Sequence, residues 1–191
     1  MSAPGPTPSQ TVGPFFHGLL REGLAVLVRP ETEGERIRIE GHVYDGERAP
    51  VSDAMVEIWQ ANARGRYHHP ADQRRAVDLD PAFTGFGRAG TDAAGFFRFE
   101  TIKPGPVPFA AQTVQAPHVN VFVLARGVLD QLVTRLYFED EAANAADPVL
   151  RRLPDERRPT LLARRTAADG WIVYRFDIIL QGEGETVFFD P

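Results

Sequence analysis

Three short stretches of the chain combine side chains that could bind a metal ion or an anion. In the first, residues 65–70, Tyr67 is followed by His68 and His69. A tyrosine that sheds its proton is a hard oxygen ligand suited to Fe(III), but the stretch can equally be a surface loop whose ring packs inward and whose imidazoles are solvated. Because adjacent side chains on an extended backbone diverge, His68 and His69 are not expected to share one ion.

The second stretch contains His118 and Asn120. Side chains two residues apart on a strand face the same way, so two histidines at this spacing could hold one ion. Asn120 is instead a neutral amide, which adds no negative charge and binds ferric iron weakly. The pair therefore favours a buried histidine that is hydrogen-bonded to the backbone or to a loop.

The third stretch, residues 134–138, carries Arg135 and Tyr137. Strand alternation sends these two side chains to one face and Leu136 to the other. Arg135 could be a solvated edge charge or an ion-pair partner. Its planar guanidinium could also hold a carboxylate through two parallel hydrogen bonds.

Strands must position most of these residues, since apolar and polar residues alternate along much of the chain. Strands are predicted over residues 36–43, 51–59, 96–101, 118–125, 131–138, 171–180 and 186–189. Residues 61–94 are expected to be mostly irregular, and the prolines of residues 104–108 to hold an extended loop. A helical turn is predicted after Asp147, and a helix over residues 161–165 with Thr160 as its cap.

This pattern predicts an all-β chain, a β-sandwich with long irregular loops and a few short helices. Residues 1–10 are rich in proline, serine and glycine and are expected to form an extended arm. Residues 11–191 are expected to form one β-sandwich domain, because 191 residues is the usual length of a single domain.

Composition excludes several classes of function. The 21 Lys plus Arg are outnumbered by 26 Asp plus Glu, for a net charge of -5, so no nucleic-acid partner is expected. With no cysteine, the chain can form neither a disulfide framework nor a thiolate metal site. No apolar run is long enough for a signal peptide or a membrane span, so a cytoplasmic protein without membrane contact is expected.

Several longer strings, in order, resemble the intradiol ring-cleavage dioxygenases. They occupy residues 56–67, 95–99, 101–106, 117–118 and 134–138. Residues 7–15 and 182–190 resemble more narrowly the α subunits of the two-chain members of that family. The resemblance therefore extends from residue 7 to the end of the chain.

The resemblance implies a non-haem Fe(III) held by two tyrosines and two histidines, but it matches this chain incompletely. It places the tyrosines at Tyr67 and Val107, the histidines at His118 and Asn120, and a substrate-binding arginine at Gln115. One phenolate and one imidazole leave most of a 3+ charge uncompensated in a buried pocket. We therefore expect a degenerate iron site, with no metal and no catalytic residue in this chain alone.

The resemblance also implies a partner, a β subunit that keeps all four ligands and binds the Fe(III) in an α/β hetero-oligomer. This chain would line the partner's active site with Thr11, Gly13, Pro14, Phe15 and Arg135. The complex would cleave protocatechuate (3,4-dihydroxybenzoate) with O2 between its two hydroxylated carbons. The product would be 3-carboxy-cis,cis-muconate, in the β-ketoadipate pathway of aromatic catabolism.

Two other functions stay open at this point. The chain could be an autonomous iron dioxygenase with a different ligand set, such as His17, His68 or His69. It could also be a β-sandwich binding module without any catalytic role.

Overall fold

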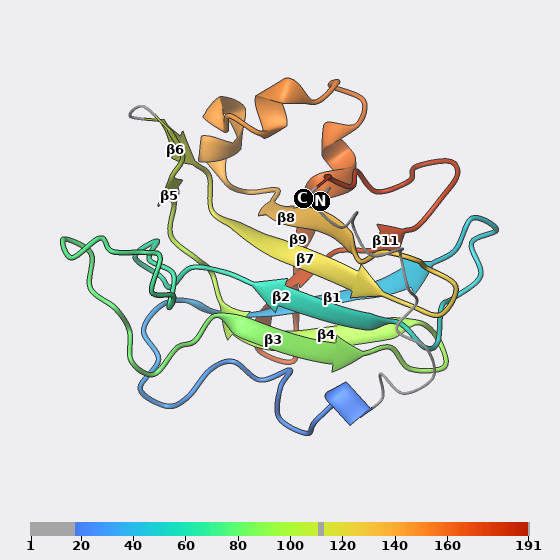
Figure 1. Ribbon diagram of the computed structural model, residues 1–191, viewed down its shortest axis with the longest axis horizontal. Helices are drawn as coiled ribbons and strands as arrows, with labels where there is room; N and C mark the ends of the chain where they lie inside the picture. Colours follow the sequence, from blue (N-terminus) through green and yellow to red (C-terminus); the bar gives the residue numbers. More distant parts are fainter. Residues whose placement is uncertain (1–17, 111–112, 191) are drawn as a thin grey trace, which may run out of the picture.

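The regular structure of the chain consists mainly of β-strands, which are joined by loops and short 3-10 helices (Figure 1). The computed structural model describes residues 18–110 and 113–190. The elements are β1 (Arg36–Tyr44), β2 (Met55–Trp59), β3 (Phe86–Gly90), β4 (Phe96–Ile102), β5 (Val107–Pro108), β6 (Val114–Gln115), β7 (His118–Leu124), β8 (Leu132–Phe138), η2 (Ala142–Ala146), η3 (Leu150–Arg152), η4 (Arg158–Leu161), β9 (Leu162–Ala168), β10 (Trp171–Arg175) and β11 (Ile178–Ile179).

The longer strands form two layers that share one core, which confirms the predicted all-β sandwich. One layer has the order β4-β1-β10-β9, with β11 continuing beside β1, and the other has the order β3-β2-β7-β8. Strand β9 links the layers, because it pairs antiparallel with β10 and parallel with β8. Strands β5 and β6 form a separate hairpin that projects from one end of the molecule (Figure 1).

The main core lies between the layers and takes alternate residues from the strands. In β7, Val119, Val121 and Val123 belong to this core. His118 and Asn120 occupy the alternate positions and so lie on the outer face of that layer. A second, smaller cluster packs on this outer face and combines Tyr137 with residues from the 3-10 helical segment, such as Leu150. The candidate residues His118 and Asn120 therefore lie on β7, and the opposite face of this strand packs in the core.

A segment before β1, residues 24–28, lies between the edge strands of the two layers, β4 and β3. This segment is called the seam below. The Leu27 N–H donates to the Glu100 carbonyl of β4 at 2.8 Å, and the Glu100 N–H donates to the Ala25 carbonyl at 2.9 Å. On the other side, the Arg88 N–H of β3 donates to the Leu24 carbonyl at 3.0 Å. The seam thus hydrogen-bonds to both layers at once.

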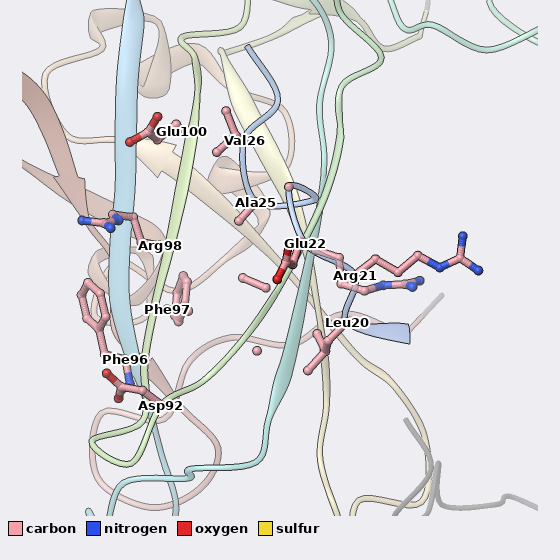
Figure 2. A pocket seen from close by; sticks show the side chains of 14 residues that line it. Leu20, Arg21, Glu22, Ala25, Val26, Asp92, Phe96, Phe97, Arg98 and Glu100 are labelled. Atoms are coloured by element: carbon pink, nitrogen blue, oxygen red, sulfur yellow. The ribbon is translucent and has the colours of Figure 1, made fainter. Parts of the chain in front are cut away.

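Beside the seam the edge strands β3 and β4 separate and leave a hollow of about 480 Å³ (Figure 2). Leu20 and Arg21 lie on one side of it, and Phe96 and Arg98 of β4 line the other. Leu20 packs closely on β3, because a Cβ atom added to Gly90 would lie 2.7 Å from its Cδ1 atom. In this hollow, side chains lie between β3 and β4, and no backbone hydrogen bonds of the seam bridge the two strands there.

Residues 61–94 are mostly irregular, as expected, but they include one short strand, β3, that the sequence did not indicate. Its sequence contains two glycines and an alanine, so it shows no apolar alternation. The structure explains these small residues, since a Cβ atom at Gly87 would lie 2.6 Å from the Cδ1 atom of Leu27 in the seam. Strand β3 forms because it pairs with β2, and its small residues leave room for the neighbouring leucines. A local sequence pattern reveals neither of these contacts.

The strand predicted over residues 171–180 is divided into β10 and β11. The Phe176 N–H still donates to the Glu40 carbonyl at 2.8 Å, but the Asp177 carboxylate then accepts from the His42 N–H at 2.9 Å in place of a backbone carbonyl. The chain passes so close to Gly41 that a Cβ atom there would lie 1.8 Å from the Phe176 carbonyl oxygen. The alternation is correct, but backbone pairing is interrupted at the crossing.

Two further expectations for the C-terminal part were wrong. Thr160 caps no helix over residues 161–165. It lies within the 3-10 helix η4, which ends at Leu161, and residues 162–168 form β9 because they pair with β10. Residues 186–189 contribute a single β-bridge, between Phe189 and Val133. In contrast, the turn after Asp147 is confirmed, since its carboxylate accepts from the N–H groups of Val149 and Leu150 at 2.8 and 2.9 Å.

In the described part of the chain, no helix is long and apolar enough to cross a membrane. The expected extended arm, residues 1–10, and its boundary with the domain lie outside the described residues.

Candidate functional site

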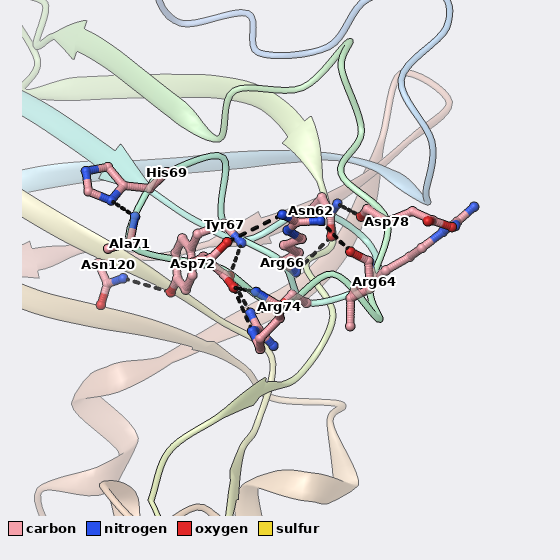
Figure 3. A network of polar contacts seen from close by, with 12 residues as sticks. Asn62, Arg64, Arg66, Tyr67, His69, Ala71, Asp72, Arg74, Asp78 and Asn120 are labelled. Atoms are coloured by element: carbon pink, nitrogen blue, oxygen red, sulfur yellow. Dashed lines mark hydrogen bonds and ion pairs between the residues drawn. The ribbon is translucent and has the colours of Figure 1, made fainter.

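Two loops that touch through their backbones position Tyr67. Gly65 has φ +80°, and a Cβ atom on it would lie 1.9 Å from the Pro106 carbonyl oxygen. The Gly105 N–H donates to the Asn62 carbonyl at 2.9 Å. The buried Asn62 side chain accepts from the Arg66 N–H at 2.9 Å and so shapes the turn that leads into Tyr67 (Figure 3). Glycine is required where the loops meet, because no side chain fits there.

The Tyr67 ring stacks on Trp59, with ring centroids 5.8 Å apart and planes inclined by 17°. The Asn120 amide nitrogen lies 3.3 Å from the Tyr67 hydroxyl oxygen and 3.2 Å from the Trp59 carbonyl oxygen, and it donates to both (Figure 3). Burial raises the pKa of Tyr67 and outweighs the opposing effects of Asn120, Arg135 and Arg74. Tyr67 is therefore a neutral phenol at neutral pH rather than a phenolate.

Asp72 and Arg74 hold the loop in front of Tyr67. The Asp72 carboxylate accepts from the Tyr67 N–H at 2.9 Å and from the Arg74 Nε at 2.8 Å. The hydrogen-bonded Arg74 guanidinium is the main reason that the pKa of Asp72 is lowered to about 2, so Asp72 is ionised at neutral pH. A second hydrogen bond, from Arg74 to the Gly65 carbonyl at 2.7 Å, ties the loop back to the glycine contact.

His118 is a buried, neutral residue, as the pattern at residues 118–120 favoured. Its side chain is 3% exposed, and its Nδ1 atom lies 2.8 Å from the Ala116 carbonyl oxygen. Because that partner is a carbonyl, Nδ1 carries the hydrogen and donates it. Burial lowers the pKa of His118 to about 4. His118 and Asn120 thus share a face, but each is used in a hydrogen bond within the protein.

Arg135 lies on the same outer face, opposite Asn120 in the register of β7 and β8. Its Nη1 atom donates to the Gln115 side-chain oxygen at 2.5 Å and lies 3.4 Å from the Tyr137 hydroxyl. Both partners are uncharged, and among the described residues no carboxylate forms an ion pair with Arg135. The structure therefore holds a half-buried guanidinium whose charge is not paired.

A buried carboxylate anchors Tyr137, the residue behind Arg135. Asp147 is 0% exposed, and its Oδ1 atom accepts from the Tyr137 hydroxyl at 3.2 Å as well as from the following turn. Its Oδ2 atom accepts from the Ala116 N–H at 2.8 Å. Several donors compensate for the burial of this charge and connect the 3-10 helical segment to the strand that carries Arg135.

The residues at the expected iron site do not fit Fe(III). Val107 is buried and has no donor atom, and the neutral amide of Asn120 already donates to the Tyr67 hydroxyl. The guanidiniums of Arg74 and Arg135 both act electrostatically on Tyr67 and would repel a ferric ion. In residues 18–110 and 113–190, no group of three or more His, Asp or Glu side chains is placed to hold a metal.

The other predicted site residues divide into two groups. His68 and His69 have different partners, since Nδ1 of His68 contacts the Phe83 carbonyl at 3.2 Å and Nδ1 of His69 accepts from the Ala71 N–H at 3.2 Å. The N-terminal candidates lie outside the described residues: Thr11, Gly13, Pro14, Phe15 and His17.

Sequence reasoning missed Asp72 and Arg74, and it recognised Asp147 only as a cap. The ion pair depends on the path of the loop from residue 67 to residue 74, which no periodicity encodes. For Asp147 there was a usable signal, because an aspartate before a proline-initiated turn lies near Tyr137 in sequence. Trp59 had been assigned to a strand, but not to the wall of the site.

Comparison with known proteins agrees with this geometry. A family model described as "Dioxygenase" matches residues 12–182. The chain is 46% identical to the protocatechuate 3,4-dioxygenase alpha chain of Pseudomonas putida, over 96% of both chains. It is 38% identical to the protocatechuate 3,4-dioxygenase beta chain of Burkholderia cepacia, over 93% of this chain and 77% of the relative.

Among solved structures, a similar one is the dioxygenase domain of a dioxygenase carbohydrate-binding protein fusion from Streptomyces sp. SirexAA-E. Its TM-score is 0.63 at 28% identity, with 93% of this chain and 99% of that chain covered. The same sandwich therefore occurs in a dioxygenase domain.

Proposed function

The chain belongs to the intradiol ring-cleavage dioxygenases, and on this basis we propose that it is the α subunit of a protocatechuate 3,4-dioxygenase. It pairs with a related β chain, and the complex cleaves protocatechuate with O2 between the two hydroxylated carbons to give 3-carboxy-cis,cis-muconate. The family is iron-dependent. In this proposal the iron belongs to the β subunit, and this chain supplies part of the wall around it.

One observation carries the proposal: the family fold is retained while the expected ligand positions are lost. Val107 and Asn120 stand at two of the four positions, and the two remaining candidates, Tyr67 and His118, are hydrogen-bonded within the chain. A fold that is kept without its metal site is expected where the chain acts through a partner. The similarity to both alpha and beta chains supports that pairing.

The proposed contact with the partner's active site consists of Thr11, Gly13, Pro14, Phe15 and Arg135. Protocatechuate carries a carboxylate, so the unpaired charge of Arg135 suits it for attracting and orienting the substrate. Backbone groups at Gly13 can contribute hydrogen bonds to the same ligand. Because this chain lacks cysteine and needs no oxidising compartment, a cytoplasmic location is part of the proposal.

Co-expression tests the proposal. This chain, a β chain that keeps all four ligands, and the two together are purified, and iron content and protocatechuate turnover are measured for each. We expect this chain alone to contain no stoichiometric iron and to be inactive. The pair should contain iron in proportion to the β chain and should turn over protocatechuate faster than the β chain does alone.

Two results would contradict the proposal in different ways. Stoichiometric iron and activity in this chain alone would identify an autonomous dioxygenase. Failure to pair, or no effect of this chain on turnover by the β chain, would favour a binding module without a catalytic role.

A further inference from the structure

We propose that the hollow over Tyr67 is a metal-free binding site for a planar aromatic carboxylate. This inference goes beyond the proposed function, because it concerns a ligand held by this chain's own residues and not the partner's active site.

The hollow has the size and the walls of a small-molecule site. Its volume is about 450 Å³, within the usual range for ligand pockets of roughly 300–1,000 Å³. Its lining combines aromatic and apolar residues, Trp59, Tyr67, His69, Ala71, Val107 and Pro108, with the polar residues Asp72, Gln73 and Arg74. The Trp59 ring lies face to face with Tyr67 and edge-on to His69, with centroids 5.8 and 6.4 Å apart. Such walls favour a flat, apolar ring.

The charge around Tyr67 favours an anion. Arg74 and Arg135 both act on the Tyr67 hydroxyl as positive charges, and Asp72 is the one negative charge that acts on it. Asp72 is paired with Arg74, with Nη2 to Oδ2 at 2.5 Å, whereas the hydrogen-bond partners of Arg135 are neutral. Arg135 does not line the hollow, but it lies opposite Asn120, whose amide donates to the Tyr67 hydroxyl. A carboxylate bound beside that hydroxyl would compensate the charge of Arg135.

Two donors at the hollow are unused by the described residues. Tyr67 accepts a hydrogen bond from Asn120, and no described acceptor takes its own hydroxyl hydrogen (Figure 3). Arg74 donates through Nε and Nη2, and no described acceptor is bonded to its Nη1 atom. A carboxylate accepts several hydrogen bonds, so it could use both donors while its ring lies against the aromatic wall.

Benzoate is a suitable probe, because it has the ring and the carboxylate but lacks the two hydroxyls through which a catechol chelates iron. Binding to the full chain is measured by equilibrium dialysis and by fluorescence. The chain has two tryptophans, so Trp171→Phe leaves Trp59 as the reporter inside the hollow. We expect one saturable site with a dissociation constant on the order of 0.1–1 mM. Acetate, which lacks the ring, and benzylamine, which reverses the charge, should bind far more weakly.

Matched variants locate the site. Val107→Trp should fill the hollow and weaken benzoate binding by about tenfold or more, whereas Val114→Trp, at an exposed position of β6 that does not line the hollow, should have no effect. If Val107→Trp does not fold, Arg74→Gln decides: it should weaken binding by about fivefold or more, and Arg75→Gln, its exposed neighbour, should not.

The inference is overturned if benzoate does not saturate the wild-type chain, if acetate or benzylamine binds equally well, or if Val107→Trp and Arg74→Gln both bind like wild type. Protocatechuate turnover by the reconstituted complex is measured separately. Turnover without benzoate binding would overturn this inference alone, and benzoate binding without turnover would overturn the proposed function alone.

Discussion

Asn120 of β7 and Gln115 of β6 are neutral residues at positions where the family resemblance places basic ones. Asn120 donates a hydrogen bond to Tyr67, where the family resemblance places a metal-binding histidine, and Gln115 accepts from Arg135, where it places an arginine. A second arginine at position 115 would repel Arg135 in a half-buried place. The neutral glutamine instead holds the guanidinium in one direction and leaves its charge available to an anion.

Replacing Arg135 tests whether that charge serves the complex. In the reconstituted α/β complex, Arg135→Ala should lower kcat/KM for protocatechuate by about ten- to a hundredfold, the effect of losing a hydrogen bond to a charged group. Arg135→Lys should recover part of it, and Arg151→Ala, an exposed arginine of η3, should leave the kinetics unchanged. Iron content should stay the same in all variants. Unchanged kinetics for Arg135→Ala would count against a role at the partner's active site.

His118 gives the stability of the chain a defined pH dependence. Its pKa is about 4 when folded and 6.5 when unfolded, so between these values the unfolded chain binds more protons. The stability contributed by the neutral ring is complete above pH 6.5 and is lost as the pH falls towards 4. Lowering the pH from about 7 to about 5 should therefore reduce the free energy of unfolding by about 2 kcal/mol through this group.

Urea unfolding of wild type and His118→Gln at both pH values measures this effect. The wild-type chain should lose about 2 kcal/mol more than the variant, because glutamine does not titrate. Equal losses in the two proteins would show that the histidine does not have a depressed pKa when folded.

At the scale of elements, close backbone contacts rather than hydrophobic patterns fix the site. The loop of Gly65 rests on the loop of Gly105 and Pro106, and this contact places Tyr67 beside Val107. The hairpin of β5 and β6 and the turn after Asp147 complete the surroundings of the outer face. Small residues at these contacts determine where the aromatic side chains lie.

Two glycine variants separate the effect of conformation from the effect of space. Gly127 has φ +81° and open space around it, whereas Gly65 has φ +80° and a carbonyl oxygen 1.9 Å from where its Cβ atom would lie. Gly127→Ala should cost about 1 kcal/mol of stability, and Gly65→Ala about 3 kcal/mol or more, since it adds a steric clash to the same backbone strain. Denaturant titration of both variants gives the two values. Similar costs would mean that the loop yields without disturbing its neighbour.

The sequence predicts the elements whose side chains alternate and fails where pairing or contact decides. The strands predicted over residues 36–43 and 118–125 are confirmed within one residue, as β1 and β7, and buried and less buried side chains alternate along both. Strand β3 is rich in small residues, and β9 is a strand because β10 lies beside it, so neither carries a local signal. Likewise Tyr67, His118 and Asn120 were recognised as candidates, but the ion pair of Asp72 with Arg74 follows from a loop path that only the structure reveals.

On the scale of the whole molecule, the core residues that stabilise the fold and the residues of the candidate site lie on opposite faces of one layer. The main core lies inside the sandwich, and Tyr67, Val107 and Asn120 are not part of it. Ligand positions could therefore change without opening a cavity in that core. This separation explains how a family fold persists in a chain whose residues do not fit iron.

Restoring the missing ligands should change the metal content of the complex. The double variant Val107→Tyr, Asn120→His would place two tyrosines and two histidines at the positions that the family resemblance assigns. We expect iron in the α/β complex to rise from about one to about two per pair, because two further donors supply the charge and coordination that ferric iron needs. Each single variant should stay near one. Metal analysis of the purified complexes distinguishes these results, and a folded double variant with no additional iron would contradict the view that the missing ligands are what keeps iron from this chain.

The seam of residues 24–28 has a consequence for how the protein behaves at high concentration. It occupies hydrogen-bonding groups on β3 and β4 that would otherwise face solvent. Unpaired strand borders are templates for adding strands from other molecules, and they lead to aggregation. The seam could be detached by a proteolytic cut or by Leu27→Pro, which removes the Leu27 N–H. The two layers would stay largely intact, but the edges of β3 and β4 would then be exposed and able to pair with strands of other molecules.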